Sequence, residues 1–105
     1  MYKAGIDIGT NSLRLLIAKV NKEGRILEAP IRMVRTARLG EGIIAGQLLP
    51  AAVERALQIL ADFAREIAAF SPIEVNVVST SVLRSVSNPE LLLDPVRDQL
   101  GWQIQ

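Results

Sequence analysis

The chain has 105 residues, 50% of them hydrophobic, and its 12 Lys and Arg against 11 Asp and Glu give a net charge of +1. This length suffices for one domain with a hydrophobic core, and the near-neutral charge leaves no electrostatic footprint for nucleic acid. Because Cys and His are absent, disulfides, thiolate and imidazole chemistry and the usual zinc sites are excluded. A metal would need oxygen ligands, which suit magnesium.

The first residues lack a targeting segment. Residues 1–3 lead directly into a short apolar strand, without the long apolar stretch and small-residue cleavage site of a signal peptide. The longest apolar run is far shorter than a membrane span. We therefore expect a cytoplasmic protein without a membrane or nucleic-acid partner.

A β-hairpin is predicted at the start of the chain. Residues 2–9 alternate between an apolar face and a second face that consists of Lys3, Gly5, Asp7 and Gly9. Asp7 therefore lies between two glycines, where a ligand can approach closely. Residues 9–12 favour a tight turn, and residues 13–20 form the antiparallel partner strand.

A third strand is predicted at residues 26–39, after a turn at residues 21–24. Pro30 cannot donate to a strand ladder, so this strand lies at a sheet edge or carries a bulge. Arg32 and Arg38 share a face and Arg35 does not. We interpret these arginines mainly as protection of the edge against aggregation.

Residues 50–70 have the period of an amphipathic helix, which Ser71 and Pro72 end. Its polar face includes Arg55, which we expect to face water. The expected buried stripe consists of Val53, Ala56, Leu57, Leu60, Ala64, Ile67 and Ala68.

The remaining chain predicts two strands separated by helical segments. Residues 73–79 form a fourth strand, and Thr80 and Ser81 can cap a short helical turn that reaches Arg84. Asn88 caps a second helical segment up to residue 100, which Pro95 kinks or divides. Residues 102–105 begin a fifth strand.

This order of elements predicts an α/β, ribonuclease-H-like domain over residues 1–105, with a mixed five-stranded sheet in the order 3-2-1-4-5. A helical crossover makes the fourth strand parallel to the first. Ligands of such sheets bind beyond the carboxyl ends of the parallel strands. The turn at residues 9–12 and the segment from Thr80 to Arg84 are therefore expected to meet there.

The residues at this meeting point suit a phosphate group. Thr10, Asn11 and Ser12 offer hydroxyl, amide and backbone N–H groups, and Arg84 adds a guanidinium. Asp7 could hold magnesium, mainly through water. The residues alone also allow plainer interpretations: an ordinary hairpin turn, an aspartate that binds a backbone group, and an arginine exposed to solvent.

Three segments resemble the exopolyphosphatase / guanosine pentaphosphate phosphatase (Ppx/GppA) family. Residues 5–18 are similar to its first phosphate loop, residues 38–42 to its loop after the third strand, and residues 79–84 to its Ala-Thr-Ser-Ala-hydrophobic-Arg motif. Asp-x-Gly-Thr alone also occurs in sugar kinases, actin-like proteins and heat-shock ATPases. The following Asn11 and Ser12, with Thr-Ser-x-x-Arg downstream, are more specific.

The resemblance implies an actin-like hydrolase that removes terminal phosphate from polyphosphate or guanosine pentaphosphate with Mg²⁺. Thr10, Asn11 and Ser12 would contact phosphate, the catalytic Arg84 would bind and neutralise the phosphoryl group, and Asp7 would lie beside the metal.

The family's catalytic glutamate motif and second phosphate loop do not occur in this sequence. We therefore expect an amino-terminal fragment that is inactive alone, and a fifth strand whose free edge favours a homodimer. The alternatives are the same domain of a sugar kinase or another actin-like ATPase, and a non-catalytic interaction module.

Overall fold

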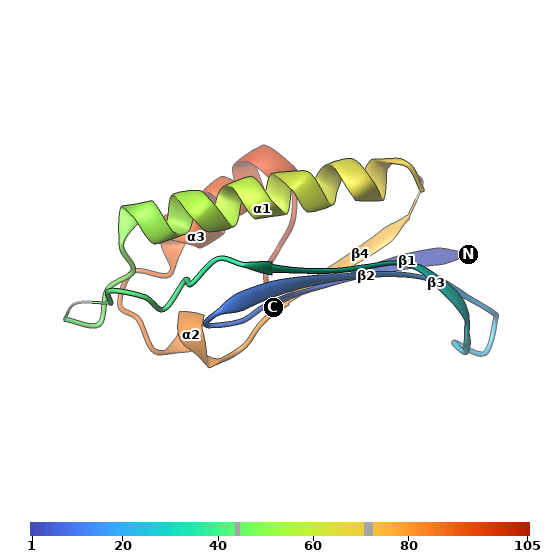
Figure 1. The fold of residues 1–105 in the computed structure, drawn as a ribbon, viewed down its shortest axis with the longest axis horizontal. Helices are drawn as coiled ribbons and strands as arrows, with labels where there is room; N and C mark the ends of the chain where they lie inside the picture. Colours follow the sequence, from blue (N-terminus) through green and yellow to red (C-terminus); the bar gives the residue numbers. More distant parts are fainter. Residues whose placement is uncertain (44, 71–72) are drawn as a thin grey trace.

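The fold is built on a mixed four-stranded sheet with the order β3-β2-β1-β4 (Figure 1). The computed structural model describes residues 1–43, 45–70 and 73–105. β2 pairs antiparallel with both β1 and β3, whereas β4 is parallel to β1. The strands are β1 (Tyr2–Ile8), β2 (Ser12–Val20), β3 (Ile26–Thr36) and β4 (Glu74–Ser79).

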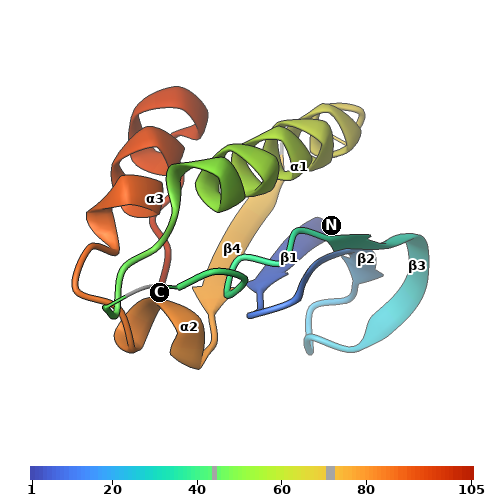
Figure 2. The same ribbon diagram turned by 60° about the vertical axis from the view of Figure 1, so that its left-hand side comes forward.

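The two longer helical segments cover the same face of the sheet. α1 (Pro50–Ala68) runs along this face and α3 (Glu90–Pro95) lies beside it, whereas the short α2 (Ser81–Arg84) follows the end of β4 (Figures 1 and 2). A π-helical turn, η1 (Val96–Leu100), continues α3. None of the helices that the structure describes combines the length and hydropathy that a membrane span requires.

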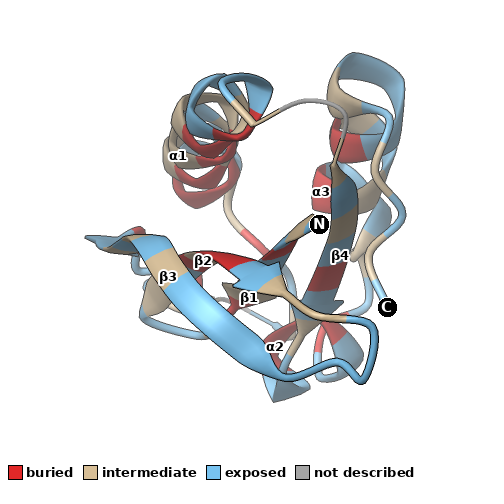
Figure 3. Cartoon of the chain, turned by 90° about the vertical axis from the view of Figure 1, so that its right-hand side faces the viewer, coloured by how far each residue is buried: buried red, intermediate tan, exposed pale blue. Residues whose placement is uncertain are grey.

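The core lies between the sheet and α1, and the alternation of β1 places its residues there. Ala4, Ile6 and Ile8 are buried against the helix side, whereas β3 is mostly exposed (Figure 3). The predicted helix stripe is correct at Val53, Ala56, Leu60 and Ile67. It is wrong at Ala68, which is exposed, and it omitted Ala52 and Phe63, which are buried. Phe63 lies three residues beyond Leu60, on the same side of the helix.

β3 is an edge strand, as Pro30 predicted. It ends at Thr36 and not at residue 39. Arg38 has a φ of 50°, which no strand tolerates, and Ala37 and Leu39 turn into the core. Arg38 therefore does not share the strand face of Arg32.

The predicted fifth strand is reduced to one parallel bridge between Val77 and Ile104, so the described sheet has four strands. Two backbone hydrogen bonds of 2.9 Å hold Gln105 against Ser79 and Val77. This segment lies beside β4, on the side that the predicted strand order requires. The mixed sheet with flanking helices otherwise confirms the predicted fold class.

The second helical segment divides near Pro95, as predicted, because α3 gives way there to η1. The predicted caps are wrong: neither Thr80 nor Ser81 caps α2 through its side chain, and Pro89 stands at the cap position of α3. Asn88 instead binds Leu48 twice. Its Oδ1 accepts the Leu48 N–H at 2.8 Å, and its Nδ2 donates to the Leu48 carbonyl at 3.2 Å. The predicted helix end at Ser71 and Pro72 lies outside the described residues.

Replacement of Gly9 by alanine is expected to destabilise the protein by about 1–3 kcal/mol, because the new Cβ would lie 2.9 Å from the Ser12 carbonyl oxygen. Gly5→Ala is the matched control, since nothing lies within 4 Å of a Cβ at that position. Urea unfolding measures both variants. Equal stability of the two would contradict the close approach at Gly9.

Asn88→Ala is expected to cost about 1–3 kcal/mol of unfolding free energy, because it leaves the backbone of the buried Leu48 without two partners. Asn88→Asp keeps the acceptor and loses the donor, so it should fall between wild type and alanine. Thermal and urea unfolding would reveal the order, and an alanine variant as stable as wild type would refute the tether.

Candidate functional site

The turn between β1 and β2 is the centre of the candidate site. Thr10 and Asn11 are exposed at its tip, and the Gly9 N–H donates to the Ser12 carbonyl at 3.0 Å. Because Gly9 has no side chain, the two arms of the turn approach closely. The predicted phosphate-contacting residues therefore occupy one short, closed loop.

The chain that follows β3 braces this turn from outside. The Asn11 carbonyl accepts the N–H groups of Ala37 at 3.0 Å and Arg38 at 2.8 Å, and the Thr10 carbonyl accepts the Gly40 N–H at 2.9 Å. A Cβ at Gly40 would collide with the Thr10 methyl group. Three backbone hydrogen bonds and one close contact thus determine where the turn lies.

The carboxyl end of β4 reaches the same region. The Thr80 N–H donates to the Ile8 carbonyl at 3.1 Å, and the Thr80 hydroxyl lies 3.4 Å from the same oxygen. Ile8 immediately precedes the turn. The structure therefore joins the ends of β1 and β4, as the parallel pairing predicted.

Arg84 is exposed at the end of α2 and, together with Thr80, lines a pocket of about 240 Å³. Ser79, Pro89 and Gln105 are among the other residues of this pocket. Among the described contacts, none joins the Arg84 side chain to Thr10, Asn11 or Ser12. Arg84 thus lies near the end of β4, and its side chain does not contact the turn in the described structure.

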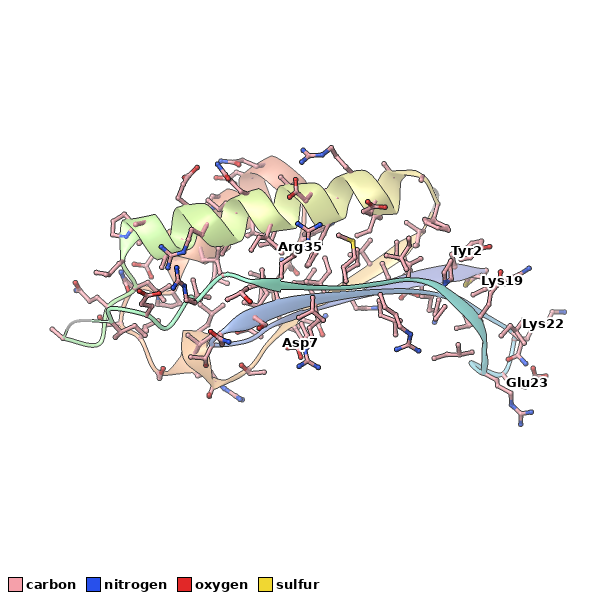
Figure 4. The ribbon with its side chains drawn as sticks, in the orientation of Figure 1. Tyr2, Asp7, Lys19, Lys22, Glu23 and Arg35 are labelled. Atoms are coloured by element: carbon pink, nitrogen blue, oxygen red, sulfur yellow. The ribbon has the colours of Figure 1, made fainter. Side chains whose placement is uncertain are left out.

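Asp7 lies on the sheet face away from α1, whereas Arg35 lies on the side facing it (Figure 4). The Oδ1 atom of Asp7 is buried and lacks a hydrogen-bond partner among the described residues. Asp7 is opposite Arg14 on β2 and borders a hollow of about 460 Å³ that includes Gly5 and Asn76. A carboxylate oxygen without a partner favours a cation or a donor in this hollow.

The residues present offer a metal one carboxylate. In the described ranges, no group of three His, Cys, Asp or Glu side chains is placed to hold an ion. Asp7 alone fits magnesium bound mainly through water and substrate oxygens, which is a common arrangement for this ion.

An arginine that we expected to face water instead contacts the chain after β3 that braces the turn. Arg55 on α1 donates from Nε to the Ala37 carbonyl at 2.9 Å and from Nη2 to the Arg38 carbonyl at 3.3 Å. The helical pattern places Arg55 beside the apolar stripe, and this border position was the only signal available in the sequence.

A separate group of charges lies at the end of the helical segment. Arg97 donates a hydrogen bond to Asp98. This hydrogen bond, together with the negative charges of Asp98 and Asp94, raises the pKa of the Arg97 guanidinium. Since arginine is already charged at neutral pH, this shift does not create a titrating group there.

Comparisons with known proteins identify the family to which this fold and sequence correspond. The profile of the Ppx/GppA phosphatase family matches residues 6–105. The chain is 37% identical over 102 residues to "Exopolyphosphatase 2" of Mycobacterium tuberculosis, which covers 93% of this chain and 32% of that protein. A putative exopolyphosphatase of Haemophilus influenzae is 36% identical over 92 residues, which cover 85% of this chain and 28% of the relative.

Solved structures give the same result. The Aquifex aeolicus member of the Ppx/GppA family superposes with a TM-score of 0.90 at 30% identity, over 100% of this chain and 34% of that one. An exopolyphosphatase from Cytophaga hutchinsonii has a TM-score of 0.91 at 26% identity, over 100% of this chain and 33% of that one. This chain spans about a third of the length of the relatives it matches. It belongs to the Ppx/GppA phosphatase family.

Proposed function

We propose that this chain is the phosphate-binding part of a phosphatase that releases terminal phosphate from polyphosphate or guanosine pentaphosphate. The observation that carries the proposal is the hydrogen bond from Thr80 to Ile8, which brings the end of β4 to the turn at residues 9–12. Phosphate sites in sheets of this kind form where such strand ends meet. The exopolyphosphatases that the chain resembles support the substrate class.

Each site residue has a role that its chemistry supports. Thr10, Asn11 and Ser12 bind phosphate oxygens through hydroxyl, amide and backbone groups. The guanidinium of Arg84, which is exposed and permanently charged, turns toward the bound phosphate and neutralises it. Charge neutralisation and positioning are the main protein contributions to phosphoryl transfer.

Asp7 would hold a magnesium ion, which supplies charge neutralisation at the phosphate when bound. The support is its buried oxygen, which lacks a partner among the described residues.

We also propose, as expectations of the sequence, a cytoplasmic location and a homodimer.

Hydrolysis forms a bond from a water oxygen to the terminal phosphorus and breaks the bond to the bridging oxygen, which leaves with the electron pair. The water must also lose a proton to a base. The resemblance assigns this base to a glutamate motif that this sequence does not contain. We therefore propose that the 105-residue chain binds phosphate groups without hydrolysing them.

Binding of tripolyphosphate to this chain is expected to weaken about tenfold or more in Arg84→Ala and in Asn11→Ala, since each loses a hydrogen bond to a charged group. Isothermal titration calorimetry measures the affinities. Arg65→Ala is the control, because this exposed residue on α1 pairs only with Asp62 among the described residues. Binding that survives both site substitutions would refute the proposed site.

Phosphate release from polyphosphate or guanosine pentaphosphate, with magnesium present, is expected to stay at buffer background for the purified chain. A colorimetric phosphate assay measures it, with Arg84→Ala as the matched control. Release above background that disappears in Arg84→Ala would contradict the assignment of the base to a glutamate outside this sequence.

A further inference from the structure

Arg55 contacts the backbone that holds the turn at residues 9–12, which we call the phosphate turn. Its Nε donates to the Ala37 carbonyl at 2.9 Å, and its Nη2 lies 3.3 Å from the Arg38 carbonyl. The side chain is 38% exposed, so it lies half-buried between α1 and the loop that follows β3. These contacts link α1 to residues 37 and 38.

The peptide group between Ala37 and Arg38 relays this contact to the turn. Its carbonyl accepts the hydrogen bond from Arg55, and its N–H donates to the Asn11 carbonyl at 2.8 Å. A charged donor on the carbonyl polarises the peptide and strengthens the hydrogen bond on its other side. One peptide unit thus lies between the guanidinium and the turn.

Arg38 needs this support because of its backbone conformation. Its φ of 50° is left-handed, which is sterically unfavourable for a residue with a Cβ. Its carbonyl accepts the Glu41 N–H at 3.0 Å in addition to the contact from Arg55. Such a conformation persists only where its surroundings hold it in place.

Glu41 joins the two arginines at the surface. Its Oε2 lies 3.0 Å from Arg38 Nε and 3.8 Å from Arg55 Nη2. All three side chains are more than a third exposed, so solvent screens the ion pairs and their contribution is small. The hydrogen bonds to the two carbonyls are therefore the significant contacts of Arg55.

We propose that Arg55 is a positioning residue for the phosphate turn: it orients the Ala37–Arg38 peptide, which in turn fixes the Asn11 carbonyl and the loop around it. This inference rests on the proposed function, because the proposed function is what assigns a phosphate ligand to the turn. Arg55 acts through the backbone and does not touch the phosphate.

The test compares the 105-residue chain with Arg55→Ala, Arg55→Lys and the control Arg65→Ala. Amide hydrogen exchange by NMR, without ligand, reports the order of the turn, and calorimetry with tripolyphosphate reports its affinity. We expect Arg55→Ala to accelerate amide exchange at Ala37, Arg38 and Gly40, whose N–H groups donate to the turn. Because a less ordered turn holds a charged ligand less well, we also expect the affinity for tripolyphosphate to fall roughly tenfold. Arg55→Lys, which keeps a charged donor, should fall between, and Arg65→Ala should match wild type.

The outcomes separate this inference from the proposed function. If wild type binds tripolyphosphate and Arg55→Ala binds it equally well, the positioning role is refuted and the phosphate site stands. If exchange stays unchanged at residues 37–40, the role is refuted irrespective of affinity. If wild type does not bind, the proposed function fails. Should Arg55→Ala not fold, Arg55→Lys alone decides the question by the same two measurements.

Discussion

The Asn11 carbonyl accepts two backbone hydrogen bonds, from Ala37 and Arg38, and the geometry of the candidate site depends on this contact. An isolated two-stranded hairpin is only marginally stable in water, so further contacts matter for holding its turn. Here the edge strand β3 ends at Thr36, and the chain then passes along the hairpin turn, with hydrogen bonds to Asn11 and Thr10, instead of continuing the sheet. The left-handed Arg38 makes that bend, and Gly40 allows it to pass close to Thr10.

The second constraint is the parallel pairing of β1 and β4. The crossover through α1 returns the chain to the other side of β1, so Thr80 arrives at Ile8, one residue before the turn. The turn, Thr80 and the pocket of Arg84 therefore come from segments about 70 residues apart in the sequence, which the sheet joins at one end. Asp7 adds its carboxylate from the face away from α1 (Figure 4). The proposed phosphate site at this end depends on the same topology that buries Ile6 and Ile8 on the opposite face.

The sequence predicted those features that depend on local periodicity. Alternation in β1 separates Asp7 from its apolar neighbours, and Pro30 indicates an edge strand. It could not predict contacts whose partners are defined only by the tertiary fold. Asn88 has the amide that suits a helix cap, yet its partner is Leu48, 40 residues earlier. Arg55 has the position of a surface residue, yet it binds the carbonyl groups of Ala37 and Arg38, which lie 18 and 17 residues away in the sequence. In the fifth strand, one bridge at Ile104 replaces the expected ladder.

A crystal structure of this chain with tripolyphosphate would test the phosphate site most directly. The proposed site requires a phosphoryl group within hydrogen-bond distance of the turn at residues 9–12 and of the Arg84 guanidinium. The main competing position is the hollow of about 550 Å³ at the other end of the sheet, which Lys3 and Lys22 line. An anion held there, with the turn and Arg84 left free of it, would contradict the site and with it the proposed function.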